Sequence, residues 1–432
     1  MAMITEALLR FQEAGEPLKI GQEVWNALSK AGQWLSRHHD RVVLNHTAGA
    51  VAALGNLYAL TGAPAWREGA QAALDVLARS QNKEGWFPEY GGADPGYTSV
   101  SINFLAQYWR RSQDLRAWQL LKRAVAFLEP FVHPDGTVGG TYGSRNTRYL
   151  LPHGLFILRH LPQARQALAR WADAQQAGRG ITLQGLDDRY RGFFLANQLL
   201  VLLDLDAGAT LDTDAASPTA KPEEMFYSEA GLVKAERGTY LLYCSLRKLG
   251  VFDCFAEREL IYADSGYDLR FADGRRATTQ WPDPQAVVSW DASQGQADVA
   301  GRLALLQSPE LFHRTLLPHR LLSHALGAIG SGGEAINRRI KALFVKPRRT
   351  APAVFRRCLR ITDQGLDIRD DLAWDAVVSD VVINRGWGRM HVPSSNFYAD
   401  RRDGQEYLDV SGKHSLSIVT TLDSRGLRRS IV

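Results

Sequence analysis

Apolar residues recur at spacings of three and four along the first half of the chain, from residue 18 to residue 206. This period places them on one face of a helix. Gly, Pro and Asn separate the runs, as in Thr61-Gly62-Ala63-Pro64, where Gly ends one helix and Pro opens the next. The pattern predicts helices at residues 24–37, 47–60, 65–80, 99–113, 115–128, 149–161, 164–174 and 186–205.

In the second half the period changes to an alternation of apolar and polar positions, which is typical of strands. Residues 231–244 alternate on both sides of a turn at Arg237-Gly238, and they predict a β-hairpin. Residues 355–361 and 365–370 predict a second hairpin in the same way. Further strands are expected at residues 377–384 and 415–422, and one helix near residues 314–328.

The two halves are joined by a segment that differs from both. Residues 207–222 contain two Pro, small polar residues and little apolar content, and are predicted to be a linker. At 432 residues the chain is too long for one ordinary domain. The predicted fold class is α+β with two domains: an incomplete α/α toroid over residues 1–206 and an antiparallel β-sandwich over residues 223–432.

Two stretches of the helical half, residues 81–92 and 132–143, repeat one phrase rich in Gly and aromatic residues. Each follows an amphipathic run and precedes another. Repeated units of helix, loop and helix build an α/α toroid, which gathers its loops at one end. There they are expected to line a carbohydrate-binding cleft with Glu89, Tyr90, Asp94, Tyr97, Tyr142, Arg145, Asn146, Arg148, Tyr149 and His153.

The order of the two halves, the linker and two short phrases resemble the heparinase II/III-like polysaccharide lyases. The phrases are residues 227–233 (Tyr-Ser-Glu-Ala-Gly-Leu-Val), which open the β half, and residues 368–372 (Ile-Arg-Asp-Asp-Leu). The resemblance covers most of the chain and is architectural. It implies an enzyme that cleaves an acidic, uronic-acid-containing polysaccharide or oligosaccharide by β-elimination, in a cleft between the toroid and the β domain.

Cleavage by β-elimination requires three functions. The uronate carboxylate must be neutralised, a base must remove the C5 proton, and an acid must protonate the leaving glycosidic oxygen. The resemblance implies Asn or Arg for the first function and Tyr or His for the other two. A Tyr side chain, whose ordinary pKa is about 10, needs a nearby cation to act as the base.

Residues around position 147 supply all of these side-chain types. If a helix begins near Thr147, Tyr149 and His153 are four residues apart and share one face. Arg145 and Asn146 then lie at the helix N-terminus, where the helix dipole also favours an anion. Alternatively, Tyr149 and His153 pack together in the core and Arg145 forms a surface ion pair.

Asn45 and His46 open another predicted helix. Asn45 either caps that helix or binds a carboxylate, and His46 is either half-buried or the base. Asp94 holds a turn or faces the cleft, and Tyr97 stacks on a sugar or packs in the core. The predicted catalytic residues are Tyr149, His153, Tyr97 and His46; the predicted substrate-binding residues are Asn45, Glu89, Tyr90, Asp94, Tyr142, Arg145, Asn146 and Arg148.

Three other functions remain open. A glycoside hydrolase would need one carboxylic acid and one carboxylate, for which Glu89 or Asp94 with Asp187 are the candidates. A uronate epimerase would use the same proton chemistry without cleavage. The third alternative is a non-catalytic glycan-binding or assembly protein of polysaccharide biosynthesis.

The composition of the chain restricts which classes of partner it is expected to bind. The net charge of +5 permits an acidic partner, but the charge is spread along the chain and no nucleic acid is predicted. Three Cys without a CxxC pair argue against a disulfide framework and a Cys zinc site, and no metal or cofactor is predicted. No apolar segment reaches membrane-spanning length, and the N-terminus does not resemble a signal peptide, so a cytoplasmic location is expected.

Overall fold

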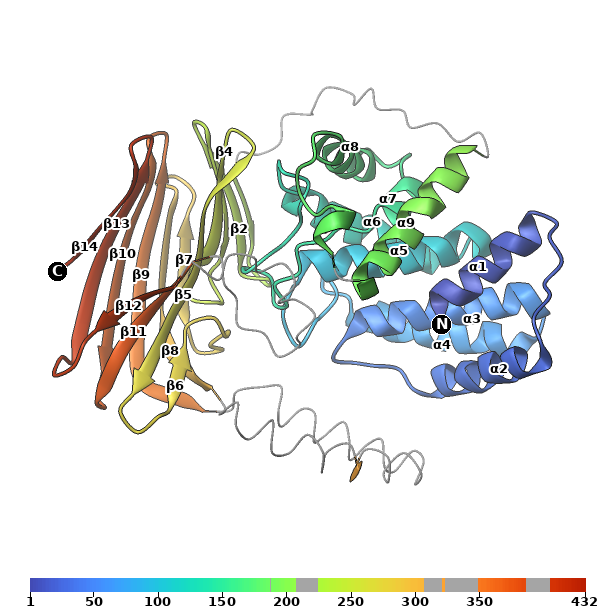
Figure 1. Ribbon diagram of the computed structural model, residues 1–432, viewed down its shortest axis with the longest axis horizontal. Helices are drawn as coiled ribbons and strands as arrows, with labels where there is room; N and C mark the ends of the chain where they lie inside the picture. The colour runs from blue at the N-terminus through green and yellow to red at the C-terminus, as the bar shows by residue number, and fades with distance from the viewer. Residues whose placement is uncertain (187, 207–223, 307–320, 323–348, 386–404) are drawn as a thin grey trace. The chain divides into compact units, whose positions relative to one another are not determined.

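The computed structural model describes residues 1–186, 188–206, 224–306, 321–322, 349–385 and 405–432 (Figure 1). These residues form two compact units, one of helices and one of strands. The predicted α+β fold class, a helical toroid followed by an antiparallel β-sandwich, is confirmed. The predicted linker, residues 207–222, lies outside the described residues, as does the helix predicted near residues 314–328 apart from positions 321 and 322.

The helical unit begins with a helix that the sequence pattern did not predict, and its other helices follow the predicted runs except for α7, which is shorter than the predicted 149–161. The helices are α1 (Ala2–Glu13), α2 (Gln22–Arg37), α3 (Leu44–Thr61), α4 (Pro64–Ser80), α5 (Pro95–Ser112), α6 (Leu115–Leu128), α7 (Pro152–Ile157), α8 (Pro162–Gln176) and α9 (Asp188–Asp206). Helices α3 and α4, α5 and α6, and α7 and α8 contact each other as consecutive pairs, and α3 also contacts α1, α2 and α5. The central position of α3 explains why its many Ala residues are buried.

Short connections between these helices have the expected turn chemistry. Gly62 follows α3 in the left-handed conformation, with φ of 69°, and Pro64 opens α4. Asp94 caps α5, because its side chain accepts a hydrogen bond from the backbone N–H of Tyr97. Pro95 occupies the first position of that helix. These caps fix where the loops enter the helices, and the loops carry the candidate site.

The second unit is a single antiparallel sheet whose strands include both predicted hairpins. The strands are β1 (Glu224–Tyr227), β2 (Leu232–Arg237), β3 (Tyr240–Ser245), β4 (Val251–Ala256), β5 (Glu259–Phe271), β6 (Arg276–Thr278), β7 (Val287–Asp291), β8 (Gln296–Leu306), β9 (Thr350–Thr362), β10 (Gly365–Trp374), β11 (Val378–Arg385), β12 (Gln405–Asp409), β13 (Ser415–Asp423) and β14 (Gly426–Ile431). The main path runs β1-β2-β3-β4-β5-β6-β8-β9-β10-β13-β14.

This sheet folds over its own core and so becomes a sandwich. Strands β2 and β3 contact β9, although several strands separate them along the sheet. Strands β2 to β4 lie in one layer of this unit, and β9, β10, β13 and β14 lie in the other (Figure 1). Along β9 the buried positions alternate, with Phe355, Leu359 and Ile361 in the core.

One inward position of β9 is charged. Arg357 is buried, and its Nε lies 2.7 Å from Oδ1 of Asp370 on β10, while its Nη2 lies 3.1 Å from Oδ2 of Asp264 on β5. Its Nη1 donates to the carbonyl of Gly250 at 2.7 Å, and the Tyr267 hydroxyl donates to Asp370. The guanidinium is therefore fully paired, and it joins strands from both layers.

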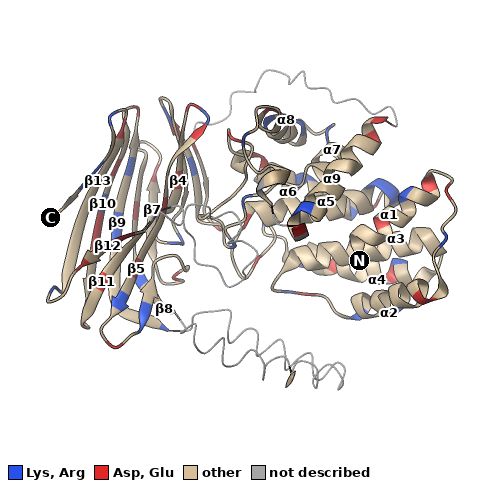
Figure 2. Cartoon of the chain, in the orientation of Figure 1, with Lys and Arg blue, Asp and Glu red and all other residues tan. Residues whose placement is uncertain are grey.

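Charged residues elsewhere are mixed. In the part of the chain that the structure describes, Lys and Arg are interspersed with Asp and Glu on helices and strands alike (Figure 2). Among the described helices, none combines the length and the hydropathy that a membrane crossing requires.

We predict that Arg357→Met lowers the free energy of unfolding by about 3–5 kcal/mol, because it leaves two buried carboxylates without a counter-charge. Arg369→Met is the matched control, since Arg369 forms only an exposed ion pair with Asp371 and its loss should cost less than about 1 kcal/mol. Urea unfolding followed by circular dichroism measures both. Equal effects of the two substitutions would contradict the conclusion that Arg357 neutralises the buried carboxylates of Asp264 and Asp370.

Candidate functional site

Both Gly- and aromatic-rich loops of the helical unit meet at the start of α3 and α5. The backbone N–H of Tyr90 donates to the carbonyl of Val42 at 2.8 Å, just before α3. The Ser144 N–H donates to the carbonyl of Ala93 at 2.9 Å, and the Ser144 hydroxyl donates to the carbonyl of Glu89 at 2.9 Å. The repeated phrase therefore builds two loops that hydrogen-bond to each other.

Glycine is required where these loops touch. A Cβ atom on Gly143 would lie 2.7 Å from Oδ2 of Asp94, and one on Gly92 would lie 2.8 Å from the Cβ of Ser144. Both distances are shorter than a Cβ atom can tolerate, so a side chain at either position would force the neighbouring loop to move. The Gly residues of the phrase thus permit the close approach of two backbones.

Glu89 is the most buried carboxyl of the first loop, with 1% of its surface exposed. Its two oxygens accept hydrogen bonds from the backbone N–H and the side-chain Nδ2 of Asn45, both at 2.9 Å. Burial raises the pKa of Glu89 to about 8, against the lowering effect of these hydrogen bonds. The prediction that Asn45 caps its helix is wrong, because α3 begins at Leu44 and the Asn45 side chain binds Glu89 instead.

Asp94 ties the two loops together. Its Oδ1 accepts from the backbone N–H of Tyr97 at 2.9 Å, and its Oδ2 accepts from the backbone N–H of Arg145 at 2.7 Å. The carboxyl is fully buried. Asp94 was predicted either to hold a turn or to face the cleft, and the structure shows that it holds the turn. Its shortest hydrogen bond is the one from the backbone N–H of Arg145.

Arg145 has the most unusual surroundings in the site. Only 4% of its surface is exposed, and its guanidinium carbon lies 4.0 Å from the ring centre of Tyr90 and 5.8 Å from that of Tyr97. Within the described part of the chain, its Nε and Nη1 atoms are buried without a hydrogen-bond partner. A buried donor that is left unpaired costs roughly 1–3 kcal/mol, and more when it is charged. An arginine in this state is suited to bind an anion that completes its hydrogen bonds.

One backbone position beside Arg145 has an unusual conformation. Tyr90 and Asn146 both have φ of 56°, in the left-handed region, which Asn adopts readily and a bulky residue such as Tyr seldom does. Strain of this kind persists only where the surrounding structure enforces it, and it is concentrated at functional sites. Here it positions the Tyr90 ring against the guanidinium.

Tyr97 provides a half-buried hydroxyl beside the cation. Burial raises its pKa to about 12, although the positive charge of Arg145 acts in the opposite direction. The phenol therefore keeps its proton at neutral pH, which suits a proton donor. Its ring also lies 6.3 Å from the ring of Tyr149.

His46 is the exposed titratable group of this region. Its side chain is 65% exposed, and its Nδ1 lies 3.4 Å from Oδ2 of Asp40. Oδ1 of Asp40 accepts from the backbone N–H groups of Val42 and Val43 at 2.8 and 3.0 Å, which fixes the carboxylate. Burial would raise the pKa of Asp40, but these hydrogen bonds and the one from His46 lower it. The sequence reasoning missed Asp40, whose only signal was its position just before the helix of His46.

The structure does not bring Tyr149 and His153 together as predicted. The expected helix start near Thr147 is wrong: α7 begins at Pro152, so Tyr149 lies in an extended segment and does not share a helix face with His153. Tyr149 belongs to an apolar cluster and stacks edge-on against Phe194 at 5.0 Å. His153 is fully buried against Gln107 and Asp204, described below.

The remaining predicted residues hold the second loop. The Tyr142 hydroxyl lies 2.7 Å from Nε2 of His133, whose Nδ1 lies 2.8 Å from the Thr137 hydroxyl, and this chain is buried. Arg148 is half-buried, and its carbonyl accepts from the N–H of Val138. Asp187, a candidate of the hydrolase alternative, lies outside the described residues.

Comparison with known proteins finds a likeness of structure. No family model matches the chain, and no curated protein matches it. The structure is similar to a chondroitin AC lyase from Streptomyces coelicolor in complex with chondroitin sulphate (TM-score 0.44, 13% identity, 82% of this chain and 50% of that chain). It is also similar to heparinase III (0.46, 8%, 93% and 63%) and to a xanthan lyase from Paenibacillus (0.42, 10%, 78% and 33%).

These likenesses concern the arrangement of helices and strands. All three proteins are polysaccharide lyases by name. The chain spans about half the length of the chondroitin AC lyase chain and 63% of the heparinase III chain.

The raised pKa of Glu89 predicts a pH-dependent stability. The carboxyl titrates at about 8 in the folded protein and near 4.5 when unfolded, so the folded state binds more protons between these values. The free energy of unfolding should therefore fall as the pH rises from about 5 to about 8. Glu89→Gln should flatten that decline, whereas Glu68→Gln, at an exposed position of α4, should not. Urea unfolding across this pH range tests the prediction, which fails if both variants follow the wild type.

Proposed function

We propose that the helical unit binds an acidic glycan and that the protein cleaves it by β-elimination. The observation that carries the proposal is the buried guanidinium of Arg145, with two N–H donors that no described residue accepts. Nε and Nη1 lie on different edges of the guanidinium, and a uronate carboxylate oxygen can accept a charge-assisted hydrogen bond from either of them. The Tyr90 ring covers the cation, and the low dielectric around it strengthens its attraction for an anion.

In this proposal Arg145 neutralises the carboxylate and so stabilises the charge that develops when the C5 proton leaves. His46, held by Asp40, takes that proton. The electron pair of the C5–H bond forms the C4–C5 double bond, and the C4–O bond to the leaving sugar breaks. Tyr97 donates its proton to the leaving oxygen, which its raised pKa permits at neutral pH. The products are an unsaturated uronate and a new chain end.

This assignment retains two of the four predicted catalytic residues, His46 and Tyr97. It omits Tyr149 and His153, because the first packs in an apolar cluster and the second is fully buried among polar partners. Hydrolysis has less support, since the oxygens of Glu89 and Asp94 are buried and bonded to the protein's own N–H groups. Epimerisation would share the first proton transfer and differ by leaving the C4–O bond intact.

Arg145→Met should lower kcat/KM by about a hundredfold or more, because it removes an interaction with the charge that grows in the transition state. Arg79→Met, at an exposed position of α4, is the matched control and should retain full activity. The assay follows the ultraviolet absorbance of the unsaturated product with a panel of uronic-acid polysaccharides. No absorbance with any of them would refute β-elimination; shortened chains without absorbance would indicate hydrolysis, and solvent proton exchange alone would indicate epimerisation.

Separate roles for the acid and the base predict separate losses of turnover. Tyr97→Phe should lower kcat by roughly a hundredfold or more and leave KM nearly unchanged, because it removes only the proton donor. His46→Gln should lower kcat to a similar degree and leave KM nearly unchanged, because a glutamine side chain cannot take the C5 proton. Tyr58→Phe on α3 is the control. If either Tyr97→Phe or His46→Gln keeps full kcat, the corresponding role is wrong.

A further inference from the structure

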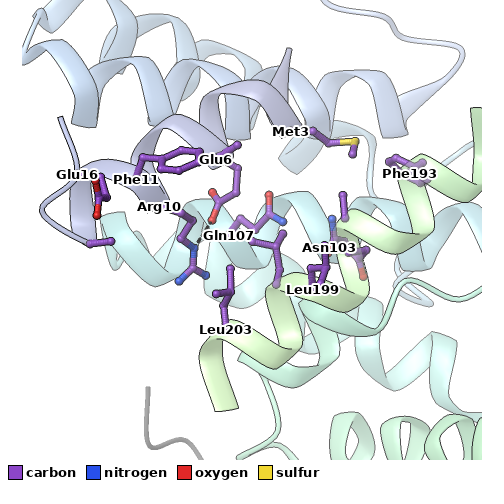
Figure 3. A pocket seen from close by; sticks show the side chains of 15 residues that line it. Met3, Glu6, Arg10, Phe11, Glu16, Asn103, Gln107, Phe193, Leu199 and Leu203 are labelled. Atoms are coloured by element: carbon purple, nitrogen blue, oxygen red, sulfur yellow. Dashed lines mark hydrogen bonds and ion pairs between the residues drawn. The ribbon is translucent and has the colours of Figure 1, made fainter. Parts of the chain in front are cut away.

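A cavity that the proposed reaction does not use opens in the helical unit, where α1, α5 and α9 line it. Its volume is about 430 Å³, within the range of small-molecule sites. Most of its wall is apolar: Met3 and Phe11 come from α1, and Phe193, Leu199 and Leu203 from α9 (Figure 3). Phe11, Leu199 and Leu203 are exposed, although they are large and hydrophobic.

The floor of this cavity is polar, and its hydrogen bonds have assigned donors and acceptors. Gln107 of α5, with 2% of its surface exposed, places its Nε2 3.3 Å from Nδ1 of His153, and Nε2 of His153 lies 2.9 Å from Oδ2 of Asp204. Burial lowers the pKa of His153, so the imidazole is neutral. The carboxylate of Asp204 can only accept, so the imidazole donates to it and accepts from the Gln107 amide.

This relay leaves the Gln107 oxygen, Oε1, as an acceptor at the cavity. The atom is buried and, among the described residues, has no hydrogen-bond partner. The same is true of the donor Nη2 of Arg10, which also lines the cavity. The other nitrogens of Arg10 are occupied, with Nε at 3.1 Å from Glu6 and Nη1 at 2.8 Å from Asp204. The cavity thus presents one unpaired acceptor and one unpaired donor beneath an apolar wall.

These two atoms select the head group of a ligand. An ionised carboxylate has no proton to give, so it would place an acceptor against Gln107 Oε1. A hydroxyl can donate to Gln107 and accept from Arg10. The nearby charges already compensate each other, since three arginines (Arg10, Arg110 and Arg111) are paired with three carboxylates (Glu6, Glu13 and Asp204). The cavity therefore offers no excess charge to a charged head group.

We propose that this cavity binds a neutral amphiphile, whose alkyl chain packs against α1 and α9 and whose hydroxyl donates to Gln107 Oε1. The two features that support this ligand are independent. The apolar wall accounts for the chain, because burying apolar surface is favourable in proportion to the area removed from water. The orphaned acceptor accounts for the hydroxyl, because a buried polar atom is otherwise costly to leave unpaired.

The test uses the full chain and a neutral fluorescent probe of apolar sites, N-phenylnaphthylamine. Decanol should displace the probe at a concentration at least about tenfold lower than decyl methyl ether or decanoate, because neither of these can donate to Gln107. Gln107→Met should abolish this preference for decanol. Equal displacement by all three compounds, or stronger displacement by decanoate, overturns the proposed head group.

Two exposed positions of α9 provide a pair of variants that leave the core untouched. Leu199 is 47% exposed and lines the cavity, whereas Leu202 is 55% exposed and does not line it. Leu199→Arg should abolish saturable probe binding, and Leu202→Arg should bind the probe as the wild type does. The proposal is overturned if the wild type shows no saturable binding or if Leu199→Arg binds equally well. It is also overturned if light scattering shows a dimer that Leu199→Arg disrupts, because the groove is then an interface between copies.

Discussion

Two buried carboxyl groups determine the geometry of the candidate site. Glu89 accepts the backbone and side-chain N–H groups of Asn45, and Asp94 accepts the backbone N–H groups of Tyr97 and Arg145. Glu89 thereby joins a residue 44 positions away in the chain, and Asp94 joins residues three and 51 positions away. Loops and the first turns of helices both have N–H groups without a regular backbone acceptor, so these groups need other acceptors when they are buried. The two acids supply those acceptors, and the loops can approach as closely as their glycines allow.

The same constraint accounts for the state of Arg145. Because Asp94 holds its backbone and the Tyr90 ring covers its guanidinium, the side chain is confined to a buried position in which Nε and Nη1 have no hydrogen-bond partner among the described residues. The carboxyl of Glu89 does not neutralise it fully, since a group with a pKa of about 8 is largely protonated at neutral pH. The guanidinium therefore keeps donors that are already desolvated and held in place, and such preorganisation favours an anionic ligand.

Periodicity and turn residues were sufficient to predict most of the fold. The helical spacing identified α2 to α6 closely, and alternation located the hairpins β2–β3 and β9–β10 because their turns carry Gly. The misplaced start of α7 has a physical cause that the sequence contained. Pro152 takes the first position of that helix, and the residue before a proline is disfavoured in the helical conformation, so Leu151 remains extended. Reading 149–161 as one helix ignored that restriction.

The sequence could predict which loops carry the candidate site, but not how their side chains are arranged. The repeated phrase brought Glu89, Tyr90, Asp94, Tyr97 and Arg145 into one group, which the structure places in one network, because Gly and aromatic residues in equivalent connections imply equivalent positions. Which of them are buried, and what each one bonds, depends on pairings between distant segments. No local pattern indicates that Asn45 turns toward Glu89 or that His153 turns toward Asp204.

Two buried arginines show why the pairing of a side chain matters more than its type. Arg357 in the β unit has two carboxylates and a carbonyl around its guanidinium, so its charge is neutralised within the protein. Arg145 in the helical unit has aromatic rings beside it and two donors that no described residue accepts. The sequence makes Arg145 a candidate for binding an anion, but it does not show which of the two arginines the fold neutralises. A buried cation that the fold has not neutralised is the one that remains able to bind a ligand, because ligand binding then removes a cost that folding left in place.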